Sequence, residues 1–371
     1  MLRGSLMKNK NPLPPSPPAH SFLPYRAFFL GANSAGGFRS FGDGVLCESR
    51  DSSVFYLYGG PGTGKSSFLK KVRETAENKK IAYELYYCSS DPESLDGIRL
   101  LSADGRRCVS VVDATAPHAR APRLNGVTGH AIDLGEFWNV RTLAAQREEI
   151  EELSWKKAEC FRCAYSYFAP AGDLLEKACR RIAPVRREKL KSFFEERIAA
   201  PSDPASAAIV ERPTAALSMF GRIEFPFFGD SCYTVNDRFA EGRAFLSAAA
   251  EILCRLGHTV CASPEPLLPH RYRAIYLPEA NFGIAIRTPD QKEEKKMRIG
   301  RFLEGRSAET DNANRLSLLL SEKFKSYGLA HLAKAREHHF ALERIYGKAM
   351  NFPQLEKKTE RVLANIFAAL E

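Results

Sequence analysis

The sequence has no long hydrophobic run. No stretch approaches the roughly 18 consecutive apolar residues that a transmembrane helix needs, so we expect no membrane-spanning segment. The first 25 positions contain basic residues but lack the continuous apolar segment of a secretory signal peptide. The nine cysteines are an odd number and are scattered along the chain. Because disulfide frameworks are typical of secreted proteins, these absences together predict reduced thiols and a cytoplasmic location.

A paired metal-binding motif is also missing. Cys160 and Cys163 form a lone C-x-x-C in a segment of helical composition, without the second pair that a zinc site of this type needs. Neighbouring histidines such as His338 and His339 do not share a helix face and are typical of a polar helical surface. We therefore expect incidental thiols and histidines here rather than zinc or redox chemistry.

Acidic residues are fewer than basic ones, with 44 Asp and Glu against 54 Lys and Arg, a formal net charge of +10. Such a balance gives some affinity for anions, including nucleic acid. The basic residues alternate with acidic ones along segments of helical composition, as at residues 147–149 and 186–189. Interleaved charge is typical of a solvated helix surface, so the sequence does not favour nucleic acid as a partner.

The 371 residues allow two domains of ordinary size. Residues 1–25 are proline-rich and lack hydrophobic periodicity, which predicts a mobile tail, and Met7 could be the true start of the chain. We predict a first domain with a helical extension at residues 26–200 and a linker at residues 201–210. A second domain, ending in helices, is predicted at residues 211–371.

The most informative segment is residues 59–66, whose sequence GGPGTGKS matches the Walker A phosphate-binding loop, G-x-x-x-x-G-K-[ST]. It follows an apolar run at residues 54–58 that predicts a buried strand, and it precedes a segment with helical hydrophobic spacing. Glycines let the backbone approach phosphate closely, and backbone N–H groups at a helix N-terminus bind anions. We therefore predict that ATP is bound by Gly59, Gly60, Pro61, Gly62, Thr63, Gly64, Lys65, Ser66 and Ser67.

Two side chains of this loop have specific expected roles. Lys65 should contact the β- and γ-phosphates and take part in catalysis, and the Ser66 hydroxyl should ligate Mg²⁺. A second metal anchor is predicted at Asp113, because residues 108–113 form an apolar run that ends in an acidic residue, the Walker B pattern. The sequence therefore predicts an Mg²⁺–ATP site.

Two loop residues complete the catalytic candidates. Asp91 follows a β-rich run at residues 81–88 and would emerge at the same sheet edge as the Walker A loop. There it could orient water, although turn formation by Asp explains the residue equally well. His118 follows the Walker B strand and could face the γ-phosphate or simply be exposed. No glutamate directly follows Asp113, which argues against fast hydrolysis.

The second half repeats the first in weakened form. The motif at residues 88–95 returns at residues 261–267, and the apolar spacing after the Walker A loop returns at residues 245–253. We therefore predict a duplicated α/β fold, each copy a P-loop NTPase three-layer sandwich with appended helices. Arg243 stands in place of Lys65 and Arg287 in place of Asp113, so the second copy is predicted to be degenerate and not to bind Mg-nucleotide. The alternative is two unrelated α/β domains.

The motifs at residues 59–66, 88–97, 112–118 and 134–138, in this order, resemble those of a family of uncharacterised bacterial ATP-binding proteins. These proteins come mostly from Firmicutes and have tandem P-loop halves, and the resemblance covers most of residues 26–371. It implies ATPase-like activity and no particular substrate. In that family the second half often retains a P-loop, and this chain departs from the pattern there, so the resemblance does not imply hydrolysis at two sites.

The leading hypothesis is a cytoplasmic, Mg²⁺-dependent ATP-binding protein with slow ATPase activity in its first half. Two alternatives stay open. The polar loop at residues 89–96 suits a phosphotransferase acting on a small molecule or nucleotide. The silent second half and the long helices suit a nucleotide-gated binding module with little turnover, whose partner is an unknown protein or small molecule.

Overall fold

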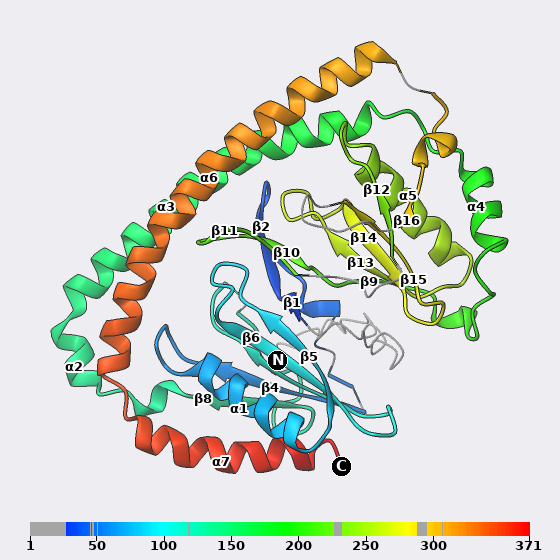
Figure 1. Ribbon diagram of the computed structural model, residues 1–371. Coiled ribbons are helices and arrows are strands. Elements are labelled where there is room, and N and C mark those ends of the chain that lie inside the picture. The colour runs from blue at the N-terminus through cyan, green and yellow to red at the C-terminus, as the bar shows by residue number, and fades with distance from the viewer. Residues whose placement is uncertain are drawn as a thin grey trace, which may run out of the picture.

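The computed structural model describes residues 27–44, 46, 48, 49, 51–117, 119–225, 232–287, 295–305 and 307–371. The predicted tail at residues 1–25 and the catalytic candidate His118 lie outside the described residues. Two mixed sheets, each flanked by helices, are connected by a pair of long helices, α3 and α6 (Figure 1). Among the described residues, no helix has both the length and the apolar character that a membrane span needs.

The first sheet has the strand order β1-β5-β6-β7-β4-β8. Its strands are β1 Ala27–Phe29, β4 Ser52–Tyr58, β5 Ala82–Tyr87, β6 Leu95–Leu101, β7 Cys108–Asp113 and β8 Gly129–Asp133. β4 pairs in parallel with β7 and β8, while β6 is antiparallel to both of its neighbours. The predicted strands around the Walker A and Walker B motifs are therefore confirmed, and they are adjacent.

One strand of this sheet was not expected. The sequence predicts a polar loop over residues 89–97, but the chain returns to strand at Leu95 and continues as β6. The reason is burial, because Leu95, Ile98 and Leu100 all lie in the apolar core against α1. Asp96 is consequently a strand residue and is buried.

The second sheet has the order β9-β13-β14-β15-β12-β16 when it is followed from β9. Its strands are β9 Ile209–Glu211, β12 Cys232–Val235, β13 Val260–Pro264, β14 Tyr272–Leu277, β15 Phe282–Ile286 and β16 Lys295–Lys296. Each pair of neighbours runs in the same relative direction as the corresponding pair of the first sheet: parallel, antiparallel, antiparallel, parallel, parallel. The two sheets thus share one topology.

Smaller elements follow the same plan. A hairpin follows the first strand of each sheet, β2 Gly31–Ser34 with β3 Gly37–Ser40 and β10 Ala215–Ser218 with β11 Gly221–Glu224. The Asn33 side-chain amide donates to the Leu217 carbonyl over 2.7 Å and so joins the hairpins. The 3-10 turns are η2 Gly42–Gly44, η3 Gly135–Phe137, η4 Pro204–Ser206 and η5 Ile299–Phe302.

Each sheet has helices on one face and the other sheet on the opposite face. Helix α1, Lys65–Asn78, packs on the first sheet, and α5, Glu241–Arg255, packs on the second. Residues on the remaining faces share one core cluster, with Tyr56 and Tyr86 from the first sheet and Cys261 and Tyr276 from the second. The predicted three-layer sandwich for each half is therefore wrong. Both faces of these strands are apolar, and the sequence alone does not show whether a helix or a sheet covers such a face.

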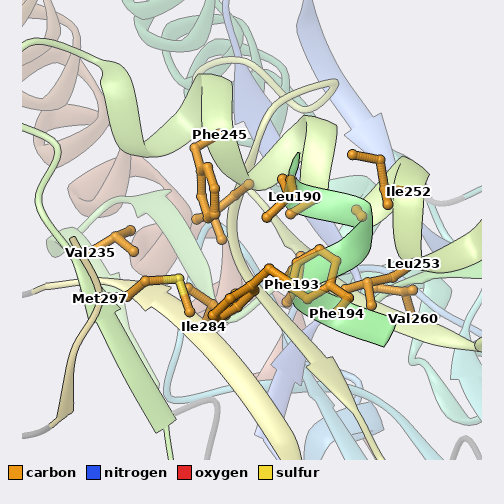
Figure 2. Close-up of a cluster of buried hydrophobic side chains, with 14 of the residues drawn as sticks. Leu190, Phe193, Phe194, Val235, Phe245, Ile252, Leu253, Val260, Ile284 and Met297 are labelled. Carbon is orange, nitrogen blue, oxygen red and sulfur yellow. The ribbon is translucent and has the colours of Figure 1, made fainter. Parts of the chain in front are cut away.

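The short helix that follows each long helix packs on the sheet of the other half of the chain. Helix α3, Arg147–Arg180, runs beside α6, Ala308–Lys348, along the outside of the molecule (Figure 1). After α3, the short helix α4, Arg187–Glu195, contributes Leu190, Phe193 and Phe194 to the core of the second sheet (Figure 2). After α6, helix α7, Phe352–Ala368, contributes Val362, Ile366 and Phe367 to the core of the first sheet. The domain boundaries stay predictions. The two halves are interlocked, because each contributes a helix to the core of the other half's sheet. A short helix, α2 Val140–Ala145, precedes α3.

Candidate nucleotide-binding site

The Walker A loop connects β4 to α1 through residues 59–64. Gly62 and Gly64 have φ angles of 70° and 86°, in the left-handed region that favours glycine. A Cβ atom on Gly62 would also come within 2.5 Å of the carbonyl oxygen of Glu343. Two separate constraints, backbone conformation and close approach of another helix, therefore require glycine at position 62.

Lys65 lies folded over this loop. Its ammonium group donates to the carbonyls of Gly59 at 2.5 Å and Gly60 at 2.9 Å. The same Nζ is 3.5 Å from Oδ2 of Asp113. The structure therefore brings together the lysine and the carboxylate that the sequence assigned to the Walker A and Walker B motifs, on adjacent parallel strands.

Asp113 lies at the end of β7 and is mostly buried, and its carboxylate also accepts from Thr115, through the backbone N–H at 2.8 Å and through the hydroxyl. Burial raises the pKa of Asp113; the positive charge of Lys65 opposes this, and the negative charge of Asp96 adds to it. Thr115, two residues beyond it, thus fixes the orientation of this carboxylate.

Ser66 and Asp113 fit a magnesium ion that arrives with a nucleotide. The Ser66 hydroxyl oxygen accepts from the backbone N–H of Leu95 at 3.0 Å, which holds it at the start of α1. Hydroxyl and carboxylate oxygens are the hard donors that Mg²⁺ prefers, together with phosphate oxygens of the substrate. Within the described ranges, no group of three or more His, Cys, Asp or Glu residues could hold a metal by itself.

The remaining predicted residues are distributed unevenly. Thr63 is buried and its hydroxyl donates to the Gly60 carbonyl at 2.8 Å, so it stiffens the loop, whereas Ser67 is exposed on α1. Asp91 is buried, and its Oδ1 accepts from the backbone N–H of Glu93 at 3.2 Å. That bond is the turn-forming role left open by the sequence. Burial raises the pKa of Asp91, opposed by the Glu93 hydrogen bond.

The second half of the chain covers the Walker A loop, which sequence reasoning missed. The rings of Trp138 and Tyr346 lie 5.3 Å apart, and a Cβ atom on Gly60 would come within 3.4 Å of the first and 3.7 Å of the second. A Cβ atom on Gly64 would be 3.1 Å from Leu355 of α7. Position 346 lies nearly 300 residues beyond the loop in sequence, and the helical pattern there carries no signal of this contact.

Three titratable side chains of the long helices α3 and α6 lie near the Walker A loop. Burial lowers the pKa of Lys157 on α3, and the nearby Lys65 charge lowers it further. His339 on α6 has its pKa lowered to about 4, first by burial and then by the charges of Lys157 and Lys65. Burial raises the pKa of Glu343, and the Asp91 charge adds to this while Lys65 and Lys157 oppose it. Both long helices therefore bring ionisable groups into the electrostatic range of Lys65.

The corresponding loop of the second sheet, residues 236–240, is one residue shorter than residues 59–64. Ala240 precedes α5 with a φ of 71°, close to the 86° of Gly64 before α1. Counted from these two residues, Glu241 holds the position of Lys65, so the expectation that Arg243 stands in place of Lys65 is wrong by two residues. Arg243 forms ion pairs with Asp237 and, at 2.8 Å, with Glu265. The space that would receive phosphate is thus occupied by internal charge pairs.

Strand pairing corrects one predicted equivalence. Leu57 pairs with Asp113 in the first sheet, and Val235 pairs with Ile286 in the second. The residue in the register of Asp113 is therefore Ile286, and Arg287 lies one position beyond it. The expectation that Arg287 takes the place of Asp113 is wrong by one residue, although a carboxylate is missing from that position either way.

A cavity of about 780 Å³ lies beside the second loop, at the carboxyl ends of β12 and β16. Its wall contains charges of both signs, including Arg181, Lys296, Arg298, Glu241 and Asp311. It is far from Lys65 in the fold, so cavity volume alone does not identify the phosphate site. The chemistry of the side chains does, and it favours the first loop.

A strand, a glycine loop, a helix and an acidic residue on the next parallel strand define the first half as a P-loop NTPase domain. The model of the KAP family P-loop domain matches residues 44–193, which run from before β4 into α4. Comparison with curated proteins gives no match, and comparison with solved structures gives none. The family match and the site geometry both indicate nucleotide binding in the first half.

Proposed function

We propose that the chain is an Mg²⁺-dependent ATP-binding protein with slow ATPase activity in its first half. The observation that carries the proposal is the placement of Lys65 Nζ 3.5 Å from Asp113 at the mouth of the Walker A loop. Lys65 would exchange its two carbonyl contacts for the β- and γ-phosphate oxygens of ATP. Ser66 and Asp113 would hold Mg²⁺, which when bound neutralises charge on the phosphates.

The second half is proposed to be a duplicated copy that binds no nucleotide. Support comes from the common strand order and from the left-handed residue retained before both helices, Gly64 and Ala240. Alanine in that conformation is uncommon, so Ala240 is best explained as the replacement of an ancestral glycine. The pairing of Arg243 with Asp237 and Glu265 supports the loss of phosphate binding, because the cation is already neutralised.

A nucleotide-gated binding module is the second candidate, and one contact favours it. Gly62 at the centre of the Walker A loop packs against the backbone of α6, and Asn314 near the other end of α6 donates to the Phe239 carbonyl in the loop of the second sheet. A change in the loop on nucleotide binding would therefore act directly on the long helix pair. In this function ATP occupancy, rather than turnover, would control a partner.

The test is a titration of the full chain with ATP, with and without Mg²⁺, followed by single-turnover measurement of phosphate release. We expect one ATP per chain and slow, Mg²⁺-dependent release of phosphate. Asp113→Asn should keep much of the ATP affinity and lose the Mg²⁺-dependent hydrolysis. Undetectable ATP binding by the unmodified chain would contradict the proposal. ATP binding without hydrolysis would contradict the ATPase activity and favour the nucleotide-gated binding module.

A further inference from the structure

The face of α6 that meets the Walker A loop presents a carboxylate. The Glu343 carbonyl oxygen would lie 2.5 Å from a Cβ atom on Gly62, and the Gly347 nitrogen would lie 3.1 Å from it. Tyr346, on the same stretch of α6, lies beside Gly60. Residues 343–347 of α6 therefore lie against the loop that would hold the phosphates.

Among the described residues, His339 is the one titratable partner in direct reach of the Glu343 carboxylate. Its Oε1 lies 3.6 Å from Nε2 of His339, one helical turn away. Since the pKa of His339 is lowered to about 4 by burial and by nearby lysines, that imidazole is uncharged at pH 7. No described residue places a hydrogen-bond donor within 3.5 Å of the Glu343 carboxylate. The group is about a third exposed, so water reaches it.

The neighbouring elements account for the charges that act on Glu343. Lys65 at the start of α1 and Lys157 on α3 are cationic, Asp91 after β5 is anionic, and His339 precedes it on α6. Burial raises the pKa of Glu343 and the Asp91 charge adds to this, while the two cations oppose the rise.

Two other carboxylates near the Walker A loop, those of Asp113 and Asp91, have printed hydrogen bonds of their own. Asp113 is held by both donors of Thr115 and lies beside Lys65, and Asp91 closes the turn to Glu93. The position directly after Asp113, where many ATPases carry a glutamate, is Ala114. The first half by itself therefore lacks a glutamate where one is commonly used.

We propose that Glu343 is the catalytic carboxylate of this ATPase and is supplied to the first half by the second. It accepts one proton from the attacking water. The water oxygen forms a bond to the γ-phosphorus while the bond from that phosphorus to the β,γ-bridging oxygen breaks. The products are ADP and inorganic phosphate, and the proton passes from Glu343 to solvent as they leave. This role rests on the ATPase function proposed above.

The decisive variant is Glu343→Gln, which keeps the size of the side chain and the backbone contact to Gly62. We expect ATP affinity within about threefold of the unmodified chain, while single-turnover hydrolysis falls roughly 10²- to 10⁴-fold, the range for loss of a general base. Glu337→Gln is the matched control, because Glu337 is exposed on the same helix, and it should leave both quantities unchanged.

A pH profile of the hydrolysis rate gives a second readout. In the unmodified chain the rate should rise with pH through the raised pKa of Glu343, since only the ionised carboxylate accepts a proton. In Glu343→Gln this rise of the rate with pH should be absent. Wild-type hydrolysis by Glu343→Gln, or loss of ATP binding together with hydrolysis, would overturn the inference while the nucleotide site stands. An unmodified chain that binds ATP without hydrolysing it would also overturn it. If the unmodified chain does not bind ATP, the proposed function itself is contradicted.

Discussion

The two strand-to-helix loops of this protein share a backbone plan and differ in chemistry. Both follow a strand paired in parallel on each side, and both enter the helix through a residue with left-handed φ, 86° at Gly64 and 71° at Ala240. In the first loop Lys65 lies on backbone carbonyls that phosphate can replace. In the second, Arg243 is held by two carboxylates. The comparison teaches that one strand-loop-helix plan can carry either a lysine on exchangeable carbonyl contacts or an arginine fixed by internal ion pairs.

The largest expected effect separates the two loops by function. Lys65→Ala should lower ATP affinity at least roughly a hundredfold, about 2.7 kcal/mol, because it removes the cation that contacts the phosphates. Arg243→Lys keeps a cation beside the second loop and should not create a second site, because that loop is shorter and Asp237 and Glu265 remain. Calorimetric stoichiometry checks both, and two ATP per chain in Arg243→Lys would break the comparison.

The next effect concerns stability in acid. Burial favours the neutral form of Glu265, but Arg243 and then Arg222 and Lys325 outweigh it and lower the pKa to about 2. A carboxyl with a lowered folded pKa contributes stability above its unfolded value, near 4.5, and that contribution is lost as pH falls toward 2.

Arg243→Ala should therefore cost about 3 kcal/mol at neutral pH, because it leaves buried carboxylates uncompensated. It should also flatten the loss of stability between pH 4.5 and 2. Urea unfolding at several pH values measures both, and an unchanged acid profile would show that Glu265 does not depend on Arg243.

A further variant measures how much the contact between α6 and the first loop contributes to the free energy of unfolding. Gly62→Ala should destabilise the chain by about 2 kcal/mol, from a left-handed alanine and from the contact with the Glu343 carbonyl. Gly126→Ala is the control, because Gly126 has a φ of 81° and nothing within 4 Å of its Cβ position. The difference between the two in thermal unfolding isolates the helix contact. Equal effects would mean that α6 moves away without cost.

The smallest effect compares the N-termini of the two long helices. The Ser307 hydroxyl caps α6 by accepting from the backbone N–H of Thr310 at 3.0 Å, whereas Gln146 before α3 makes no side-chain cap bond. Ser307→Ala should cost about 1 kcal/mol and Gln146→Ala close to nothing. Thermal unfolding resolves this difference, and equal costs would show that packing between α3 and α6 determines their stability.

Local features were predictable from sequence, and contacts between distant segments were not. The helix after Walker A was foreseen because Phe68, Leu69, Val72 and Ala76 repeat with the helical period, and all four are buried. The strand β6 was missed because its first residues follow a run of Ser, Asp and Pro that is typical of a loop. The sheet-on-sheet contact was missed because apolar residues on both faces of a strand do not identify what covers them.

By itself the sequence determined the phosphate loop, its lysine and the acidic residue on the next strand, because each depends on a few consecutive residues and on local backbone geometry. It also predicts a recurrence of the pattern in the second half, and the duplication stays a prediction. Only the tertiary structure decided that α4 packs on the second sheet and α7 on the first, and that the Glu343 backbone contacts Gly62. The reason is physical: Glu343 and Gly62 lie some 280 positions apart in sequence, and the apolar spacing of a helix specifies that one face is buried but not which surface buries it.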